Sequence, residues 1–371
     1  MLPSGRHREP GRDDYGSGGP RQTGPRQKIR DRYGRPGVAV ADVDQAAAED
    51  DRTMSTIETI TPSRPCIVAG FDNSPSGYDA VALGRTLAIA TGARLIVANV
   101  YPLAAELVLD SKVDEKLRQD ALRTARRAHI VLEGFDDWDP HACAAAPAAR
   151  GLHEVAEREQ AEMIVVGSTH RHGLGRVMPG ATAEKLLRGA GVPVVVAPAG
   201  WSGGDLRTIG AGFDGSRESH AALRAAAALA LAGGSDLLAL SVFEAPHPAN
   251  PVFAVTGHGY AEITGEMREE HRRRLEEATE SLPSDCACTA AVVEGDPARV
   301  LADQSRRLDL LVIGSRGYGA ARATLAGTVG HRLATASRCP LMLIPRGVEH
   351  PLRRIGAPRR RIEARRPQQD R

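Results

Sequence analysis

The sequence has few aromatic residues and no long apolar run. Phe, Trp and Tyr make up only 4% of its 371 residues, so any core must be built from Ala, Val, Leu and Ile. No uncharged apolar stretch reaches about 18 residues, which argues against a transmembrane helix. The N-terminus carries charge but no apolar segment, so no secretion signal is expected and the predicted location is the cytoplasm.

Neither charge excess nor cysteine pairing points to a function. Basic and acidic residues number 48 and 46, which disfavours specific binding of nucleic acid along the whole chain. The five cysteines are scattered, and Cys286-Ala-Cys288 lacks the two-residue spacer of a redox or zinc pair. Reduced thiols in a cytosolic protein are therefore expected, with no metal site.

Two nucleotide motifs are missing or misplaced. The P-loop pattern GxxxxGK[ST] does not occur, which excludes a P-loop motor. Residues 210–215 spell GxGxxG, but these glycines lie mainly inside a predicted strand and not in the turn beyond it. The first copy of the repeat described below lacks the pattern, so dinucleotide binding is not predicted.

An internal repeat organises most of the chain. The segment 66–74 recurs at 209–216, 163–168 recurs at 310–315, and 192–196 recurs at 339–344. The repeat predicts two copies of one domain, domain 1 at 62–200 and domain 2 at 205–346. In each copy, short apolar runs alternate with helical stretches, which predicts a five-stranded parallel sheet covered by helices on both faces. Strands are expected at 66–71, 94–100, 142–146, 163–167 and 193–197, and at 208–213, 236–242, 289–293, 310–314 and 341–344.

Both ends of the chain have a different composition. Residues 1–61 are rich in Gly, Pro, Arg and Asp without apolar periodicity, and we expect a disordered arm. Met54, just before the first strand, is a hypothetical true initiator, which the intact mass of the native protein would test. Residues 347–371 are expected to form a disordered basic tail, since nine arginines and three acidic residues follow from Arg346 onward.

Glycines after the fourth strand of domain 2 are suited to an anion. Gly314 and Gly317 follow the strand, and Gly327-Thr328 precedes a predicted helix. Backbone N–H groups and a hydroxyl at a helix start can hold phosphate oxygens without a lysine. The alternative is a glycine-rich turn that only packs.

A carboxylate follows the first strand of each copy. Asp214 ends its strand at the same edge of the sheet, where ligands bind in open α/β folds, and could accept hydrogen bonds from ribose hydroxyls. Its alternative role is to cap the next helix, although Ser216 could do that.

These residues together resemble the universal stress protein family in its tandem two-domain form. Gly314, Gly317, Gly327 and Thr328 match the family pattern G-x2-G-x9-G-[ST], and Asp214 matches its Asp, over a resemblance that spans about 62–345. The resemblance implies an adenine nucleotide α-hydrolase-like α/β fold that binds ATP, with or without Mg²⁺. It also implies that Ile313, Arg316 and Val329 line the pocket, and that Val242 lies near the adenine.

Domain 1 departs from this pattern. Asp72 and Ser74 are present, and Gly167 and Gly180 correspond to Gly314 and Gly327. However, His170 replaces the second glycine and Ala181 replaces the threonine, so ATP binding in domain 1 is left open. His170 and His172 could contact phosphate or simply be solvated loop residues.

The predicted function is a nucleotide-responsive regulatory or stress-response protein. No general base beyond Asp214 is apparent, so an enzyme is not expected, although slow ATP hydrolysis is compatible with the sequence. The alternative is a nucleotide-independent interaction or dimerisation protein in which at most domain 2 binds a ligand. The apolar runs 194–196 and 341–344 are expected to pair domains within one chain or in a homodimer, as such edges do in the family.

Overall fold

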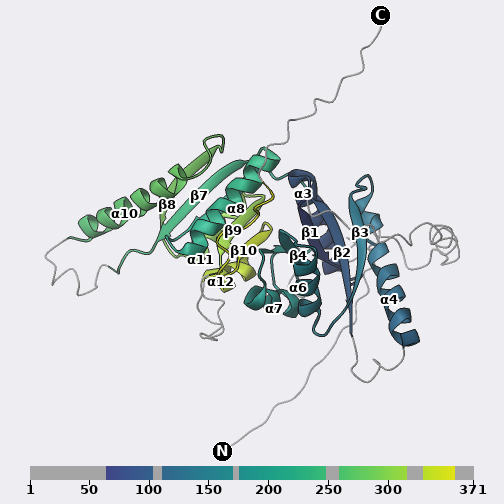
Figure 1. Ribbon diagram of the computed structural model, residues 1–371. Helices are drawn as coiled ribbons and strands as arrows, with labels where there is room; N and C mark the ends of the chain where they lie inside the picture. The colour runs from purple at the N-terminus through teal and green to yellow at the C-terminus, as the bar shows by residue number, and fades with distance from the viewer. Residues whose placement is uncertain (1–63, 103–110, 170–174, 248–258, 316–328, 356–371) are drawn as a thin grey trace, which may run out of the picture. The chain divides into compact units, whose positions relative to one another are not determined.

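The computed structural model describes residues 64–102, 111–169, 175–247, 259–315 and 329–355 (Figure 1). The predicted N-terminal arm and Met54 lie outside the described residues. So do most of the predicted tail, His170 and His172.

Each domain alternates strands with helices along the chain. Domain 1 comprises β1 Cys66–Gly70, α3 Pro75–Thr91, β2 Arg94–Tyr101, α4 Ser111–Arg126, α5 His129–Leu132, β3 Trp138–Ala144, α6 Ala148–Arg158, β4 Met163–Gly167, α7 Ala181–Gly189 and β5 Val194–Ala197. Domain 2 comprises β6 Thr208–Phe213, α8 Arg217–Gly233, β7 Asp236–Phe243, α10 Tyr260–Glu280, β8 Cys288–Glu294, α11 Pro297–Gln304, β9 Leu310–Gly314, α12 Val329–Ala336 and β10 Leu341–Ile344.

The ten strands form one sheet in the order β3-β2-β1-β4-β5-β10-β9-β6-β7-β8. All neighbours within each domain are parallel, while β5 and β10 pair antiparallel, with Leu341 opposite Val196 and Leu343 opposite Val194. The apolar edges that were expected to pair domains thus pair within one chain. In each domain the strand order reverses beside the first strand, which opens a crevice at the carboxyl ends of β1 and β4 and of β6 and β9.

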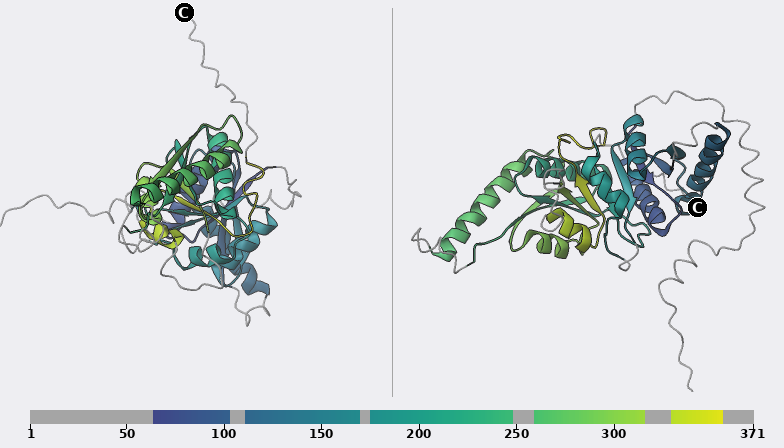
Figure 2. Two further views of the ribbon diagram at one scale, coloured as in Figure 1. Left: turned by 90° about the vertical axis from the view of Figure 1, so that its left-hand side faces the viewer. Right: turned by 90° about the horizontal axis from the view of Figure 1, so that it is seen from below.

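Helices cover both faces of the sheet, as the sequence predicted (Figure 2). One core cluster unites side chains of α3, α4, α8 and α10 with the sheet, and a second unites those of α6, α7, α11 and α12. Small residues make up much of the buried surface of the helices. Helix α8 alone buries six alanines. Ala, Val, Leu and Ile fill this core almost without aromatics, as the composition required.

The third strand of domain 1 begins four residues earlier than expected. It runs over Trp138–Ala144, with Pro140 inside it, where the sequence predicted 142–146. Proline is tolerated there because β3 is an edge strand that pairs only with β2, so the missing N–H costs no ladder bond.

The expected C-terminal tail is wrong in its first part. Residues 346–355, here called the C-terminal strap, pack against the fold: Leu352 and Ile355 are each 3% exposed within a core cluster. Arg354 Nε lies 2.6 Å from Oε1 of the buried Glu162 at the start of β4. The prediction considered only the positive charge of this segment and overlooked Leu352 and Ile355. Burial of these two apolar side chains holds the segment against the fold.

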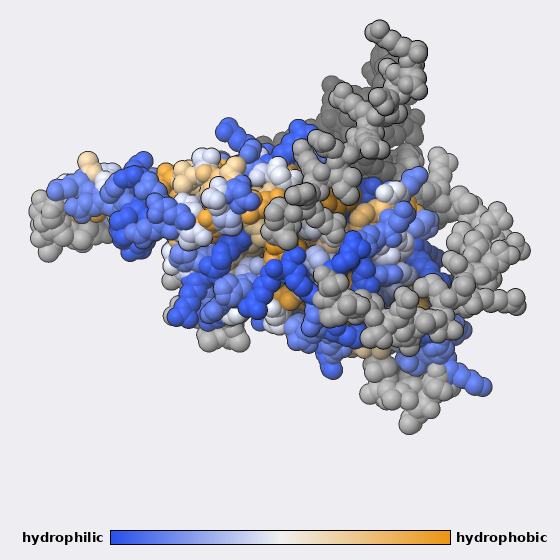
Figure 3. Space-filling model, turned by 45° about the horizontal axis from the view of Figure 1, so that its top comes forward, coloured by the Kyte–Doolittle hydropathy of each residue, from blue (hydrophilic) through white to orange (hydrophobic). Residues whose placement is uncertain are grey.

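The surface is mainly hydrophilic on the face drawn in Figure 3. On α10, Arg272 pairs with Glu269 and Glu276, while Arg274 pairs with Glu270. These exposed ion pairs between residues three and four positions apart stabilise the helix locally.

Candidate functional site

A cavity occupies the crevice of each domain. The domain 2 cavity measures about 330 Å³ and the domain 1 cavity about 290 Å³. Each lies at the carboxyl ends of its central strands, where the chain reverses its strand order.

The domain 2 cavity brings together five residues singled out from the sequence. Asp214, Val242, Ile313, Gly314 and Val329 all line it, although they come from the ends of three strands and the start of one helix. Val242 and Ile313 are buried and supply apolar surface, whereas Asp214 is exposed and supplies charge.

Four other predicted site residues lie outside the described residues: Arg316, Gly317, Gly327 and Thr328. In sequence they fall between β9, which ends at Gly314, and α12, which begins at Val329. Both flanking residues line the cavity, but the roles of these four stay predictions.

The sequence reasoning missed several lining residues: Gly212, Phe213, Ser216, Ser219, Leu240, Pro297, Leu301 and Gly330. Leu240 could have been found, because residues two apart on a strand share a face and Val242 was already assigned. Pro297 begins α11 and Leu301 lies in the middle of this helix, whose position over the cavity depends on how it packs and not on its own sequence.

Asp214 serves the helix cap as well as the cavity. Its Oδ1 accepts hydrogen bonds from the Ser216 N–H at 3.0 Å and from the Ser216 hydroxyl at 2.5 Å. Ser216 Oγ in turn accepts from the Ser219 N–H at 3.2 Å and caps α8. Ser216 is therefore the direct cap, and Asp214 orients it while its carboxylate borders the cavity.

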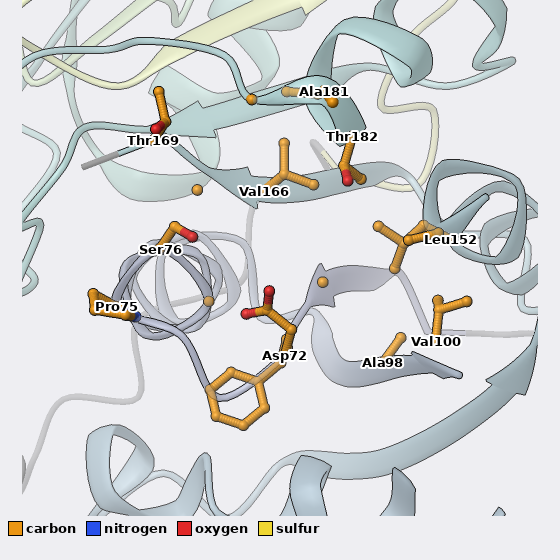
Figure 4. Close-up of a pocket in the computed structure, with 17 residues that line it drawn as sticks. Asp72, Pro75, Ser76, Ala98, Val100, Leu152, Val166, Thr169, Ala181 and Thr182 are labelled. Atoms are coloured by element: carbon orange, nitrogen blue, oxygen red, sulfur yellow. The ribbon is translucent and has the colours of Figure 1, made fainter. Parts of the chain in front are cut away.

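Domain 1 repeats this arrangement. Asp72 Oδ1 accepts from the Ser74 N–H at 3.0 Å and from the Ser74 hydroxyl, and Ser74 caps α3 through the Gly77 N–H at 3.2 Å. Figure 4 shows the Asp72 carboxylate directed into the cavity, across from Thr182.

The glycines at the ends of β4 and β9 serve helix packing. A Cβ on Gly167 would lie 2.6 Å from the carbonyl carbon of Ser76 and 2.9 Å from its Cα. A Cβ on Gly314 would lie 2.7 Å from both the carbonyl carbon and the Cβ of Glu218. Both glycines line their cavities, yet the close approach of the facing helix already requires them, so their presence does not by itself indicate a ligand.

Gly180 contrasts with Gly167. It lines the domain 1 cavity at the start of α7, and a Cβ there would meet nothing within 4 Å. No side chain caps α7. Packing therefore does not explain this glycine.

The two cavities differ in their walls. Ala98 in domain 1 takes the place of Leu240, and Gly77 takes the place of the buried Ser219. A Cβ on Gly77 would lie 2.8 Å from Asp72 Oδ1, so this glycine lets the carboxylate sit closer to its helix.

Asp214 is the one ionisable side chain among the described residues that line the domain 2 cavity. Behind the cavity wall, the His220 ring meets Phe213 edge-on, with centroids 4.9 Å apart. Burial, helped by Arg224, lowers the pKa of His220, so that this imidazole is neutral near pH 7 and adds no positive charge to the site.

None of the helices that the structure describes is long and apolar enough to cross a membrane.

The chain is similar in sequence to a known protein family and to several of its members. The model of the universal stress protein family matches residues 66–198 and 206–345, which together make up more than half of the chain. A universal stress protein of Mycolicibacterium smegmatis is 32% identical over 188 residues, and one of Mycobacterium tuberculosis is 30% identical over 187. Each match covers 50% of this chain and 62% of the relative, so less than two thirds of either relative is spanned.

A solved structure shares the fold across both domains. The crystal structure of a universal stress protein from Archaeoglobus fulgidus superposes with a TM-score of 0.51 at 16% identity. The match covers 76% of this chain and 96% of that one. At this identity the likeness concerns the tandem α/β fold alone.

Proposed function

The chain belongs to the universal stress protein family, with two of its domains in tandem, and on this premise we propose that domain 2 binds ATP. In this proposal the protein is a nucleotide-responsive regulator of the stress response. Its five free thiols suit a reducing compartment such as the cytoplasm.

One observation carries the proposal. Five residues picked from the sequence for nucleotide binding gather around a single cavity at the point where the strand order reverses. Apolar walls with one carboxylate fit a nucleoside, because a base needs apolar contact and a ribose needs a hydrogen-bond acceptor.

Each residue has a definite role in this proposal. Val242 and Ile313 contact the adenine, and Asp214 accepts from the ribose hydroxyls. The phosphates extend toward Gly314 and the start of α12, where the helix dipole favours negative charge. Mg²⁺ would accompany the triphosphate and offset part of its charge.

We propose a binding protein and not a catalyst. Asp214 already accepts two hydrogen bonds from Ser216 at Oδ1, so one of its two carboxylate oxygens is engaged in supporting the helix cap. Any hydrolysis is expected to be slow.

The alternative, an interaction protein independent of nucleotide, applies best to domain 1. There Gly180 precedes Ala181, where the family pattern has a hydroxyl, although Asp72 and Gly167 are kept. The pairing of β5 with β10 uses the expected dimerisation edges inside the chain, which favours an intramolecular domain pair over a homodimer through those strands.

Calorimetric titration of the full chain with ATP and Mg²⁺ tests the proposal. We expect Asp214→Ala and Gly317→Asp to weaken binding at least tenfold, the latter by adding bulk and negative charge to the predicted phosphate loop. Asp72→Ala is the matched control, because it removes the same cap-supporting carboxylate from domain 1. Wild-type protein that takes up no ATP would refute the proposal, and so would equal effects of the two alanine variants.

A further inference from the structure

An ion pair joins two helices at the edge of the domain 2 cavity. Arg332 Nη1 of α12 lies 2.6 Å from Asp296 Oδ2. Asp296 immediately precedes Pro297, and Arg332 follows Gly330 by two positions; both neighbours line the cavity. The pair therefore sits at the rim, where α11 and α12 begin.

Asp296 holds this arginine from a fixed position. Its Oδ1 accepts from the Arg299 N–H at 2.8 Å and caps α11, while its Oδ2 is left to face Arg332. The hydrogen bond from Arg332, followed by that from the Arg299 backbone, lowers the pKa of Asp296, so the pair is ionised at neutral pH.

The guanidinium keeps binding capacity toward a ligand. It has five N–H donors, and within the part of the chain that the structure describes one of them is hydrogen-bonded, from Nη1 to Asp296 Oδ2. The Arg332 side chain is 50% exposed, so water or an anion can reach it. Side chains on a helix lean toward its N-terminus, which directs this one back over the first turn of α12, beside Val329 and Gly330.

Domain 1 offers an internal comparison. Ala146, before Pro147, takes the place of Asp296, and Lys185, five residues after Gly180, takes the place of Arg332. Lys185 is exposed and has no acidic counterpart at Ala146. The ion pair thus belongs to the domain that also carries the complete glycine pattern.

We propose that Arg332 is a specificity-determining residue of the domain 2 site that binds the terminal phosphates of a nucleoside triphosphate. This assignment rests on the proposed function. A guanidinium matches a phosphate with two parallel hydrogen bonds, and Asp296 keeps it at the rim before the ligand arrives. Because the base and ribose are assigned to the cavity walls, which do not include Arg332, this residue is expected to distinguish ATP from adenosine.

The test compares the dissociation constants of ATP and adenosine in the full chain. For Arg332→Gln we expect ATP binding to weaken roughly tenfold or more, the effect of one charged hydrogen bond, with adenosine binding unchanged within about twofold. Arg332→Lys should recover part of the loss, because it restores the charge without the planar fork. Lys185→Gln and Arg306→Gln remove one positive charge elsewhere and should leave both constants unchanged.

Failure of the proposed function and failure of the Arg332 assignment give different results. If the wild type binds neither ligand, the proposed function fails and the assignment of Arg332 fails with it. If the wild type binds ATP, and the ratio of ATP affinity to adenosine affinity is the same in Arg332→Gln as in the wild type, only the assignment of Arg332 to the phosphates is overturned. An equal loss of both ligands would also overturn it, because that result indicates a structural role for the Asp296–Arg332 pair.

Discussion

Substitution of Gly167 by alanine tests whether this predicted site residue serves packing. The new Cβ would lie 2.6 Å from the Ser76 carbonyl carbon and 2.9 Å from its Cα, well inside ordinary contact distance. The obstacle is backbone of α3 and not a flexible side chain, so the helix must move away from β4. Overpacking of this kind costs about 3 kcal/mol, at the upper end of its usual range.

The conformational entropy of the unfolded chain partly offsets this destabilisation. Alanine restricts the unfolded chain more than glycine does, which stabilises the folded state by about 0.4–1 kcal/mol. The net loss is then about 2 kcal/mol, which lowers the melting temperature by roughly 3–4 °C for the two domains together.

Gly180→Ala is the matched control. Gly180 lines the same cavity, has a φ of −79° and would place its Cβ in open space. The entropic gain and the poorer helix cap nearly cancel, so stability should change by less than about 1 kcal/mol.

Thermal unfolding followed by circular dichroism measures both variants. A melting temperature of Gly167→Ala within 2 °C of the wild type would refute the close approach of α3 to β4. An equal fall in the melting temperature of Gly180→Ala would refute the conclusion that helix packing requires glycine at position 167 but not at position 180.

Two further predictions concern stability. Leu352→Ala should lower the free energy of unfolding, measured in urea, by about 2 kcal/mol, because it leaves a cavity under the C-terminal strap. Arg353→Ala, at an exposed position, should leave this free energy almost unchanged. Equal effects of the two variants would show that burial of Leu352 does not stabilise the fold. Burial is the main cause that lowers the pKa of His141, His220 and His271 in the folded protein, so the unfolded state binds more protons near pH 6. Unfolding free energy, measured in urea, should therefore fall between pH 7.5 and 5.5, and a constant or rising value would contradict this assignment.

Much of the fold followed from local patterns. Apolar runs bounded by helices located nine of the ten strands closely. Eight of these nine lie inside the sheet, where a strand covered on both faces needs an uninterrupted apolar segment whatever its neighbours are. The exception, β3, contains Pro140, and only its place at the edge of the sheet explains why proline is accepted there.

The candidate site was predictable in part. Asp214 could be assigned because it ends a strand at the edge of the sheet where ligands bind, and Val242 could be assigned from the family resemblance. Leu301 could not, since its approach to the cavity depends on the packing of α11. The role of Gly314 was also hidden, because the sequence does not show that Glu218 of another element lies against it.

The sequence by itself determined the two-copy α/β architecture, the capping serines and the residues at the strand ends, because each depends on neighbours within one turn or one strand or on the repeat. Only the tertiary structure decided that β5 pairs with β10, that the C-terminal strap is ordered by Leu352 and Ile355, and that Arg332 faces Asp296. These are contacts between segments far apart in the chain. Their free energy depends on packing and charge that become defined once the elements have assembled, so no local pattern records them.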